Sequence, residues 1–241
     1  MKLQLPELTL VMIDVQCPDL ARLAIADSMR GIDFGDAVVF SDTDLAMPGT
    51  RWVKVPKWPS IAECCKFLWY ELPKHISTGW MILIHWDGWI VNPSCWRDEF
   101  LQYDYIGAPW WYDDGLNVGN GNAIRSMRLM RFLQQNTAEF PLTTYKEDDL
   151  ISRTYRPMLQ RHGFKWPPET LASQFSFECT RPSWSSRHFM FHDSFNFPLV
   201  LAGERLDERV RLMRANPAIA HKVAELDGGR RPLILPRLAA A

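Results

Sequence analysis

The sequence predicts an α/β protein: a single domain in which helices flank a mixed, mainly parallel β-sheet. Strand and helix patterns alternate along residues 8–86, one strand is apolar nearly throughout, and 241 residues suit a single α/β domain. The content of 47% hydrophobic and 23% charged residues argues against a disordered chain. The formal net charge of -1 argues against a generically basic nucleic-acid-binding protein.

The opening segment has the order strand, helix, strand. Residues 8–15 form an apolar, β-branched run that is typical of a buried strand. Residues 18–29 have helical spacing, and Pro18 suits the first turn of a helix. A second short strand is predicted over residues 37–41. Short links between such elements indicate a parallel sheet.

The next elements continue this alternation. A helix is predicted over residues 60–72, with Ser60 as its N-cap and Glu63 at the capping-box position. Residues 80–86 are hydrophobic nearly throughout, as expected of a central parallel strand. Further helices are predicted over residues 126–135, 148–163 and 202–224.

Charge is distributed unevenly along the chain. Residues 201–241 hold eight basic and five acidic residues, whereas residues 1–100 hold nine basic and thirteen acidic ones. We therefore expect one domain over residues 1–200 and a basic helical extension over residues 201–241, which packs on the domain or trails from it. Residues 227–241 are expected to be loose.

Two features bear on the compartment. The five cysteines are odd in number and form no C-x-x-C pair, which favours a reducing compartment. No apolar run has the length of a signal peptide or of a membrane-spanning helix. We expect a cytoplasmic protein without a membrane span.

Several polar residues are candidates for a functional site. Asp87 follows the central strand, where open α/β sheets bind ligands, and a carboxylate there suits Mg²⁺ or Mn²⁺. Gly119, Asn120 and Gly121 can bring backbone N–H groups close to a ligand. Taken alone, each of these has an ordinary alternative as a turn.

Other acids and a histidine extend this set. Glu147 and Asp148 precede a helical pattern, where a helix cap is the simpler explanation. His192 follows an apolar stretch, and a surface histidine is the alternative there. Carboxylates also follow the first two strands, and an ordinary loop role is equally compatible with them: Asp14, Asp42 and Asp44.

In their order along the chain, these pieces match a known pattern. The pattern includes Trp86-Asp87-Gly88, the stretch D-Y-I-G-A-P-W over residues 104–110, Gly119-Asn120-Gly121, Glu147-Asp148, Phe175-Ser176-Phe177-Glu178 and Phe191-His192. It resembles a glycosyltransferase-like family and, more broadly, the GT-A glycosyltransferases. The resemblance implies a Rossmann-like GT-A fold that binds a nucleotide-diphosphate sugar through a divalent metal, Mn²⁺ or Mg²⁺.

The resemblance also implies roles for single residues. Asp87 corresponds to the last acid of the Asp-x-Asp metal motif, and His192 to a late metal ligand. Asp148 corresponds to the general base of inverting members, with Glu147 as the reserve candidate. The chain departs from the pattern at His85, which stands where the first Asp is expected, and at Asn122, which stands where a second Gly is usual.

Substrate contacts are expected from aromatic and acidic residues. Seven of the 11 Trp fall around the proposed site, and an indole ring packs well on the apolar face of a sugar. They are Trp69, Trp80, Trp86, Trp89, Trp96, Trp110 and Trp111. Trp69 and Trp80 are expected in the core, and several of the others as sugar or base platforms. Trp110 and Trp111 are the candidates for substrate contact, together with Trp86 beside His85 in the donor site. Asp14 is expected to hold the nucleoside, with Asp42 or Asp44.

Three functions compete. The first is a metal-dependent, inverting glycosyltransferase whose acceptor is a glycan precursor or a hydroxymethylated DNA base. Arg205 and Arg209 share a helical face and would suit an anionic acceptor, although a solvated, charge-balanced helix is the favoured interpretation of this segment. The second is a non-catalytic sugar- or nucleotide-binding module, which His85 supports. The third is a metal-dependent phosphohydrolase. The acidic residues fit this function, but the sequence has no histidine-rich cluster to support it.

Overall fold

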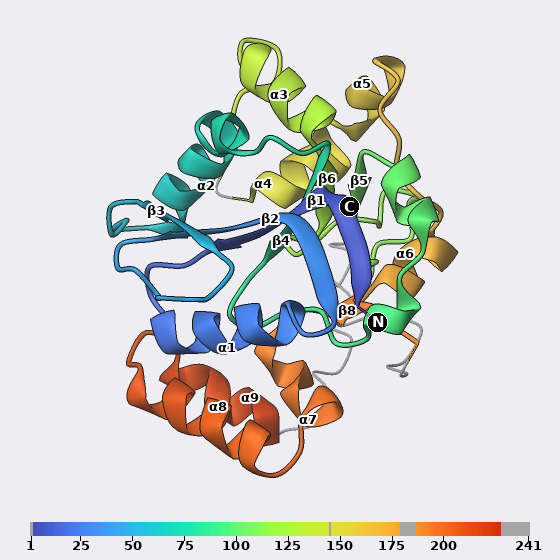
Figure 1. Cartoon of the computed structure of the whole chain (residues 1–241). Helices are drawn as coiled ribbons and strands as arrows, with labels where there is room; N and C mark the ends of the chain where they lie inside the picture. The colour runs from blue at the N-terminus through green and yellow to red at the C-terminus, as the bar shows by residue number, and fades with distance from the viewer. Residues whose placement is uncertain (1, 145, 179–186, 228–241) are drawn as a thin grey trace, which may run out of the picture.

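The computed structural model describes residues 2–144, 146–178 and 187–227. The predicted mixed, mainly parallel sheet in a single domain is confirmed (Figure 1). Its six strands lie in the order β3-β2-β1-β4-β6-β5, and β7 and β8 form a separate parallel pair. The strands are β1 (Leu3–Ile13), β2 (Ile32–Ser41), β3 (Arg51–Lys54), β4 (Trp80–Ile84), β5 (Tyr105–Ile106), β6 (Ile124–Ser126), β7 (Ser176–Phe177) and β8 (Met190–Phe191).

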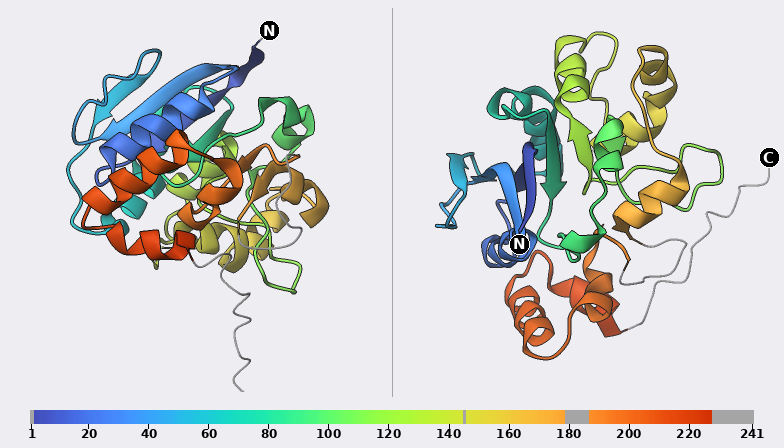
Figure 2. Two further views of the ribbon diagram at one scale, coloured as in Figure 1. Left: turned by 90° about the horizontal axis from the view of Figure 1, so that it is seen from below. Right: turned by 45° about the vertical axis from the view of Figure 1, so that its right-hand side comes forward.

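Helices cover both faces of the sheet (Figures 1 and 2). The α-helices are α1 (Pro18–Ser28), α2 (Ile61–Tyr70), α3 (Met127–Gln135), α4 (Glu147–Asp149), α5 (Arg156–Arg161), α6 (Glu169–Phe175), α7 (Phe197–Val200), α8 (Glu204–Ala215) and α9 (Val223–Asp227). Helix α1 packs on one face, with α8 packed against α1, and α2 and α3 pack on the other face. None of the described helices has the length and apolar character that crossing a membrane requires.

Strand β1 shows why the central sequence is apolar nearly throughout. Leu10 and Met12 point into the hydrophobic core beneath α1, whereas Val11 and Ile13 point into the core beneath α2. Successive side chains of a strand alternate between faces, so a strand covered on both sides has no polar face. The parallel pairing of β1 with β2 and β4 places the carboxyl ends of these three strands at one edge of the sheet.

The predicted helix over residues 148–163 is divided into three parts. Helix α4 passes into a π-helical turn, Leu150–Thr154, and α5 begins at Arg156. Pro157 lies in the first turn of α5 and has no backbone N–H with which to continue the preceding helix. The strand β3 and the short strands β5 and β6 were not predicted.

The N-cap side chain forms a hydrogen bond at the start of α3 but not at the start of α2. Helix α3 begins as predicted, with the Ser126 hydroxyl accepting a hydrogen bond from the backbone N–H of Leu129 at 3.1 Å. Helix α2 begins after Ser60, but the Ser60 side chain makes no capping hydrogen bond. The predicted capping box of this helix is therefore not formed.

The C-terminal segment packs against α1. Met213 of α8 is buried in the same core as α1. Arg205 and Arg209 both contact Asp27 of α1, at 2.7 and 2.5 Å, and Arg209 also lies over the Trp89 ring. The two arginines are thus used in internal ion pairs. The predicted loose end falls largely on residues 228–241, outside the described residues.

Candidate metal centre and its pocket

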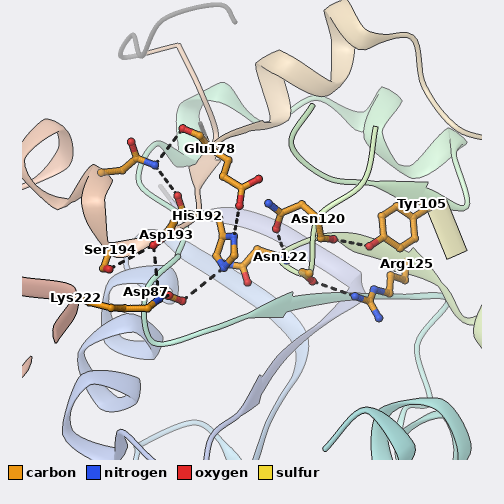
Figure 3. A network of polar contacts seen from close by, with 12 residues as sticks. Asp87, Tyr105, Asn120, Asn122, Arg125, Glu178, His192, Asp193, Ser194 and Lys222 are labelled. Carbon is orange, nitrogen blue, oxygen red and sulfur yellow. Dashed lines mark hydrogen bonds and ion pairs between the residues drawn. The ribbon is translucent and has the colours of Figure 1, made fainter. Parts of the chain in front are cut away.

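Three potential metal ligands meet at the carboxyl edge of the sheet, and two of them, Asp87 and His192, are labelled in Figure 3. His85 and Asp87 follow β4, and His192 follows β8. One ligand atom from each residue lies within 4.8 Å of those from the other two. The backbone N–H of Phe191 donates to the carbonyl oxygen of Trp89 at 3.3 Å, which holds the two segments together. The structure thus brings together Asp87 and His192, which the sequence pattern assigned to the metal, and adds His85, which was expected in the donor site.

The donor set fits a transition metal. Two imidazole nitrogens and one carboxylate oxygen suit Mn²⁺ or a similar first-row ion better than Mg²⁺, which prefers oxygen ligands. Burial, reinforced by the neighbouring His192, lowers the pKa of His85 to about 4. His85 is therefore neutral at pH 7 and offers a free lone pair. Although His85 replaces the acid expected at this position, its side chain can also bind a metal.

Glu178 orients His192. Its Oε1 lies 3.1 Å from His192 Nδ1, which leaves Nε2 directed toward Asp87 Oδ1 at 3.6 Å (Figure 3). Burial opposes a charge on His192, but its contacts with the two carboxylates raise its pKa well above the ordinary value. A carboxylate behind a metal-binding histidine fixes the ring and its tautomer. The sequence pattern included Glu178 without indicating this role.

Lys222 also reaches the cluster. Its Nζ lies 3.1 Å from Asp87 Oδ2 and 3.7 Å from Asp193 Oδ1. Burial opposes ionisation of Asp87, but His192 and Lys222 hold the pKa of its carboxyl well below the usual range. Sequence reasoning missed Lys222, because it lies 135 residues after Asp87 and no motif marks it.

A pocket of about 280 Å³ opens beside the cluster. It is lined by Ile13, Asp14, Val15, Gln16, Trp58, Ser60, Ile61, Cys64, His85, Trp86, Asp87 and His192. Asp14 is held by the backbone N–H groups of Gln16 and Cys17, at 2.8 and 2.5 Å. Burial raises the pKa of Asp14 to about 6, although these hydrogen bonds oppose the shift. The ends of β1 and β4 thus contribute to one pocket.

The two adjacent acids of α4 lie in different environments. Glu147 is buried and forms a 2.8 Å ion pair with Arg125, which is itself fully buried. The Sγ of Cys65 lies 3.7 Å from the other oxygen of Glu147. Burial, together with the charge of Glu147, raises the pKa of Asp148 to about 7. Asp148 is therefore the acid whose proton can be exchanged near neutral pH.

The Gly-Asn-Gly turn packs against the His85 ring of the cluster. A Cβ on Gly121 would lie 3.0 Å from His85 Cε1, so only a glycine lets the turn approach this ring without displacement. Asn120 has a φ of 86°, and its carbonyl oxygen accepts a hydrogen bond from the Tyr105 hydroxyl. Asn122 is buried over Gly88, where a Cβ would lie 2.2 Å from its Nδ2.

Some of the predicted substrate contacts lie outside the pocket lining. Asp42 is half-buried and close enough to raise the pKa of Asp14, whereas Asp44 is exposed and accepts a hydrogen bond from its own loop at Ala46. The Trp110 ring covers Gly119, and Trp111 is exposed on the surface. Trp86 does line the pocket.

The Trp residues of this region divide between pocket and core. Trp89 was among those that clustering favoured as sugar platforms, but it is only 1% exposed and packs on Phe191 in the core. Trp69 is fully buried, in agreement with its predicted core position.

Comparisons with known proteins give limited matches. No curated protein matches the chain by sequence. Among solved structures, the chain is similar to the crystal structure of S. aureus TarS 1-349, at 12% sequence identity and a TM-score of 0.42, over 94% of this chain and 70% of the other. A family model described as "Protein of unknown function (DUF5672)" matches residues 65–190. This match spans β4, the Gly-Asn-Gly turn, α4 and Glu178, and covers more than half of the chain. The protein therefore belongs to the DUF5672 family.

Proposed function

We propose that this protein is a metal-dependent glycosyltransferase, which moves a sugar from a nucleotide-diphosphate sugar to an acceptor hydroxyl. The observation that carries the proposal is the meeting of His85, Asp87 and His192 at the wall of a pocket on the carboxyl edge of the sheet. This edge is where open α/β folds bind nucleotides. The metal would be held by these three side chains, with Mn²⁺ as the favoured ion.

Sugar transfer requires stabilisation of the departing diphosphate and removal of a proton from the acceptor hydroxyl, and the chain offers residues for both tasks. A metal bound here would stabilise the negative charge that develops on the departing diphosphate. The acceptor hydroxyl must lose a proton as it attacks, and Asp148 is the proposed base, with a pKa of about 7 that suits this task. Glu147 is already paired with Arg125, which favours Asp148 over it.

The proposed donor site follows the pocket lining. Asp14 would contact the nucleoside from the end of β1, and Trp86 would contact the donor from the end of β4. A single base is compatible with inversion at the sugar carbon. Because Arg205 and Arg209 pair with Asp27, a neutral glycan hydroxyl is favoured as acceptor over an anionic DNA site.

A second candidate is a binding module without turnover. The contact between Lys222 and Asp87 favours it, since an ammonium group at a metal ligand offsets the charge that would attract a metal. The module would bind the same nucleotide sugars without cleaving them.

One experiment separates the two candidates. The protein is incubated with Mn²⁺ and a panel of nucleotide sugars, and release of nucleoside diphosphate is measured. We expect release by the wild type, its loss in D87A, and a decrease of about 100-fold or more in D148N. Binding of a nucleotide sugar without release would favour the module. Full activity of D148N would exclude Asp148 as the base.

A further inference from the structure

Among the described residues, the wall of the pocket contains no Lys or Arg. Its lining includes the carboxylates of Asp14 and Asp87 and the imidazoles of His85 and His192. A nucleotide-diphosphate sugar carries its negative charge on the diphosphate, and proteins usually meet such groups with Lys or Arg as well as a metal. A metal at His85, Asp87 and His192 would have part of its charge offset by Asp87. The proposed donor therefore calls for a further cation at this edge.

Lys222 stands where that cation is needed. Its ammonium contacts Asp87 Oδ2 at 3.1 Å and lies 5.1 Å from the centroid of the Trp86 ring, so it adjoins two residues of the pocket wall. Its side chain remains 27% exposed. An ammonium has three hydrogen-bond donors. Within the part of the chain that the structure describes, Lys222 donates one hydrogen bond, to Asp87, and Asp193 Oδ1 lies 3.7 Å away, which leaves capacity for an anion. Figure 3 shows the side chain extending toward the metal cluster from the C-terminal segment.

Contacts made by residues before and after Lys222 in the C-terminal segment fix its position. Asn216 donates from its side chain to the backbone carbonyl of Gln16, at 2.8 Å, in the loop that follows β1. Ile219 and Val223 flank Lys222 in the chain and are buried in the core. Helix α9 packs on the turn Ser194–Asn196, just after His192. The segment thus joins the loops that follow β1 and β8, both of which border the pocket.

We propose that Lys222 binds the diphosphate of the nucleotide sugar and of the departing nucleoside diphosphate. This role rests on the proposed function. It makes the segment after residue 200 part of the donor site, although all the site residues predicted from the sequence lie within residues 1–200. Lys222 would hold the anion beside the metal, with Trp86 and Asp87 fixing its side chain.

Pyrophosphate tests this role without knowledge of the base or sugar. The full chain is titrated calorimetrically with pyrophosphate in excess Mn²⁺, and separately with Mn²⁺ alone. The variants are K222Q, K222M and the matched control K74Q, which alters an exposed lysine paired with Glu71. K222M keeps an unbranched side chain of similar length beside Trp86, so it provides a second variant if K222Q is unstable.

We expect both Lys222 variants to bind pyrophosphate about 10- to 100-fold more weakly, with K74Q unchanged. Mn²⁺ alone should bind the variants at least as tightly as the wild type, because a positive charge beside Asp87 has been removed. Unchanged pyrophosphate affinity in both variants would overturn the inference, as would loss of Mn²⁺ binding or a wild type that does not bind pyrophosphate. If Lys222-dependent binding is found without sugar transfer, the anion site stands and the glycosyltransferase proposal fails.

Discussion

Glu178 shows how one carboxylate can act through a neighbour. It contacts His192 on the nitrogen opposite Asp87, so its effect on a metal would pass through the orientation of the imidazole ring. We expect E178A to weaken Mn²⁺ binding about 10- to 100-fold, measured by calorimetry. E178Q keeps an acceptor for the imidazole N–H and should restore part of the affinity.

The control for this comparison is E99Q, which alters an exposed carboxylate paired with Arg97. It should bind Mn²⁺ as the wild type does. A folded E178A that binds Mn²⁺ with wild-type affinity would show that Glu178 does not position His192.

The site residues that could be predicted from the sequence are those marked by a motif or by a neighbouring secondary-structure pattern. Asp87 follows an apolar strand, and the Gly-Asn-Gly motif marks a close approach that the structure places against His85. Lys222 could not be predicted, because its position beside Asp87 depends on packing between distant segments. The core position of Trp89 could not be predicted, because a cluster of Trp along the chain does not reveal which rings face the core.

Among the elements, α4 is anchored to the sheet by one buried ion pair. Glu147 begins this short helix and is fixed to Arg125 of β6, so the pair ties the loop that carries Asp148 to the sheet. Removing one partner leaves the other charge buried without compensation. We expect E147Q to lower the free energy of unfolding by about 3–5 kcal/mol, measured by urea denaturation.

A matched change on the surface separates this effect from the loss of a carboxylate in general. Glu63 forms an exposed pair with Lys66, and E63Q should change the free energy of unfolding by about 1 kcal/mol or less. Equal stabilities of E147Q and E63Q would indicate that the pair with Arg125 does not anchor α4.

The elements differ in how well their sequence reveals them. Strands β1 and β4 and helix α1 have continuous apolar or helical patterns, and these were predicted correctly apart from their ends. Strands β5 and β6 have only two and three residues, too few for any periodicity. The π-helical turn after Asp149 has no pattern of its own, and such turns occur frequently at functional sites.

At the scale of the whole molecule, the contribution of Asp148 to stability and the proposed activity should respond to pH in opposite directions. In the folded protein the pKa of Asp148 is raised to about 7 from an ordinary value of 3.8. The folded state therefore binds this proton more tightly than the unfolded state does. The cost of ionising Asp148 is absent below about pH 4, grows as the pH rises, and is complete above about pH 7. A base, by contrast, acts only in its ionised form, so transfer should increase toward pH 7 and then level off.

The variant D148N removes this ionisation and tests both trends at once. At pH 8 we expect D148N to melt at least about 2–4 °C higher than the wild type, whereas near pH 4 the two should melt together. Taking the difference between the two proteins at each pH cancels the contributions of titrating groups that do not interact with Asp148. The same variant should lose transfer at pH 8, where it is more stable. If its melting advantage does not grow between pH 4 and pH 8, Asp148 is not held in a site that opposes its ionisation. The assignment of Asp148 as a base tuned to neutral pH would then fail.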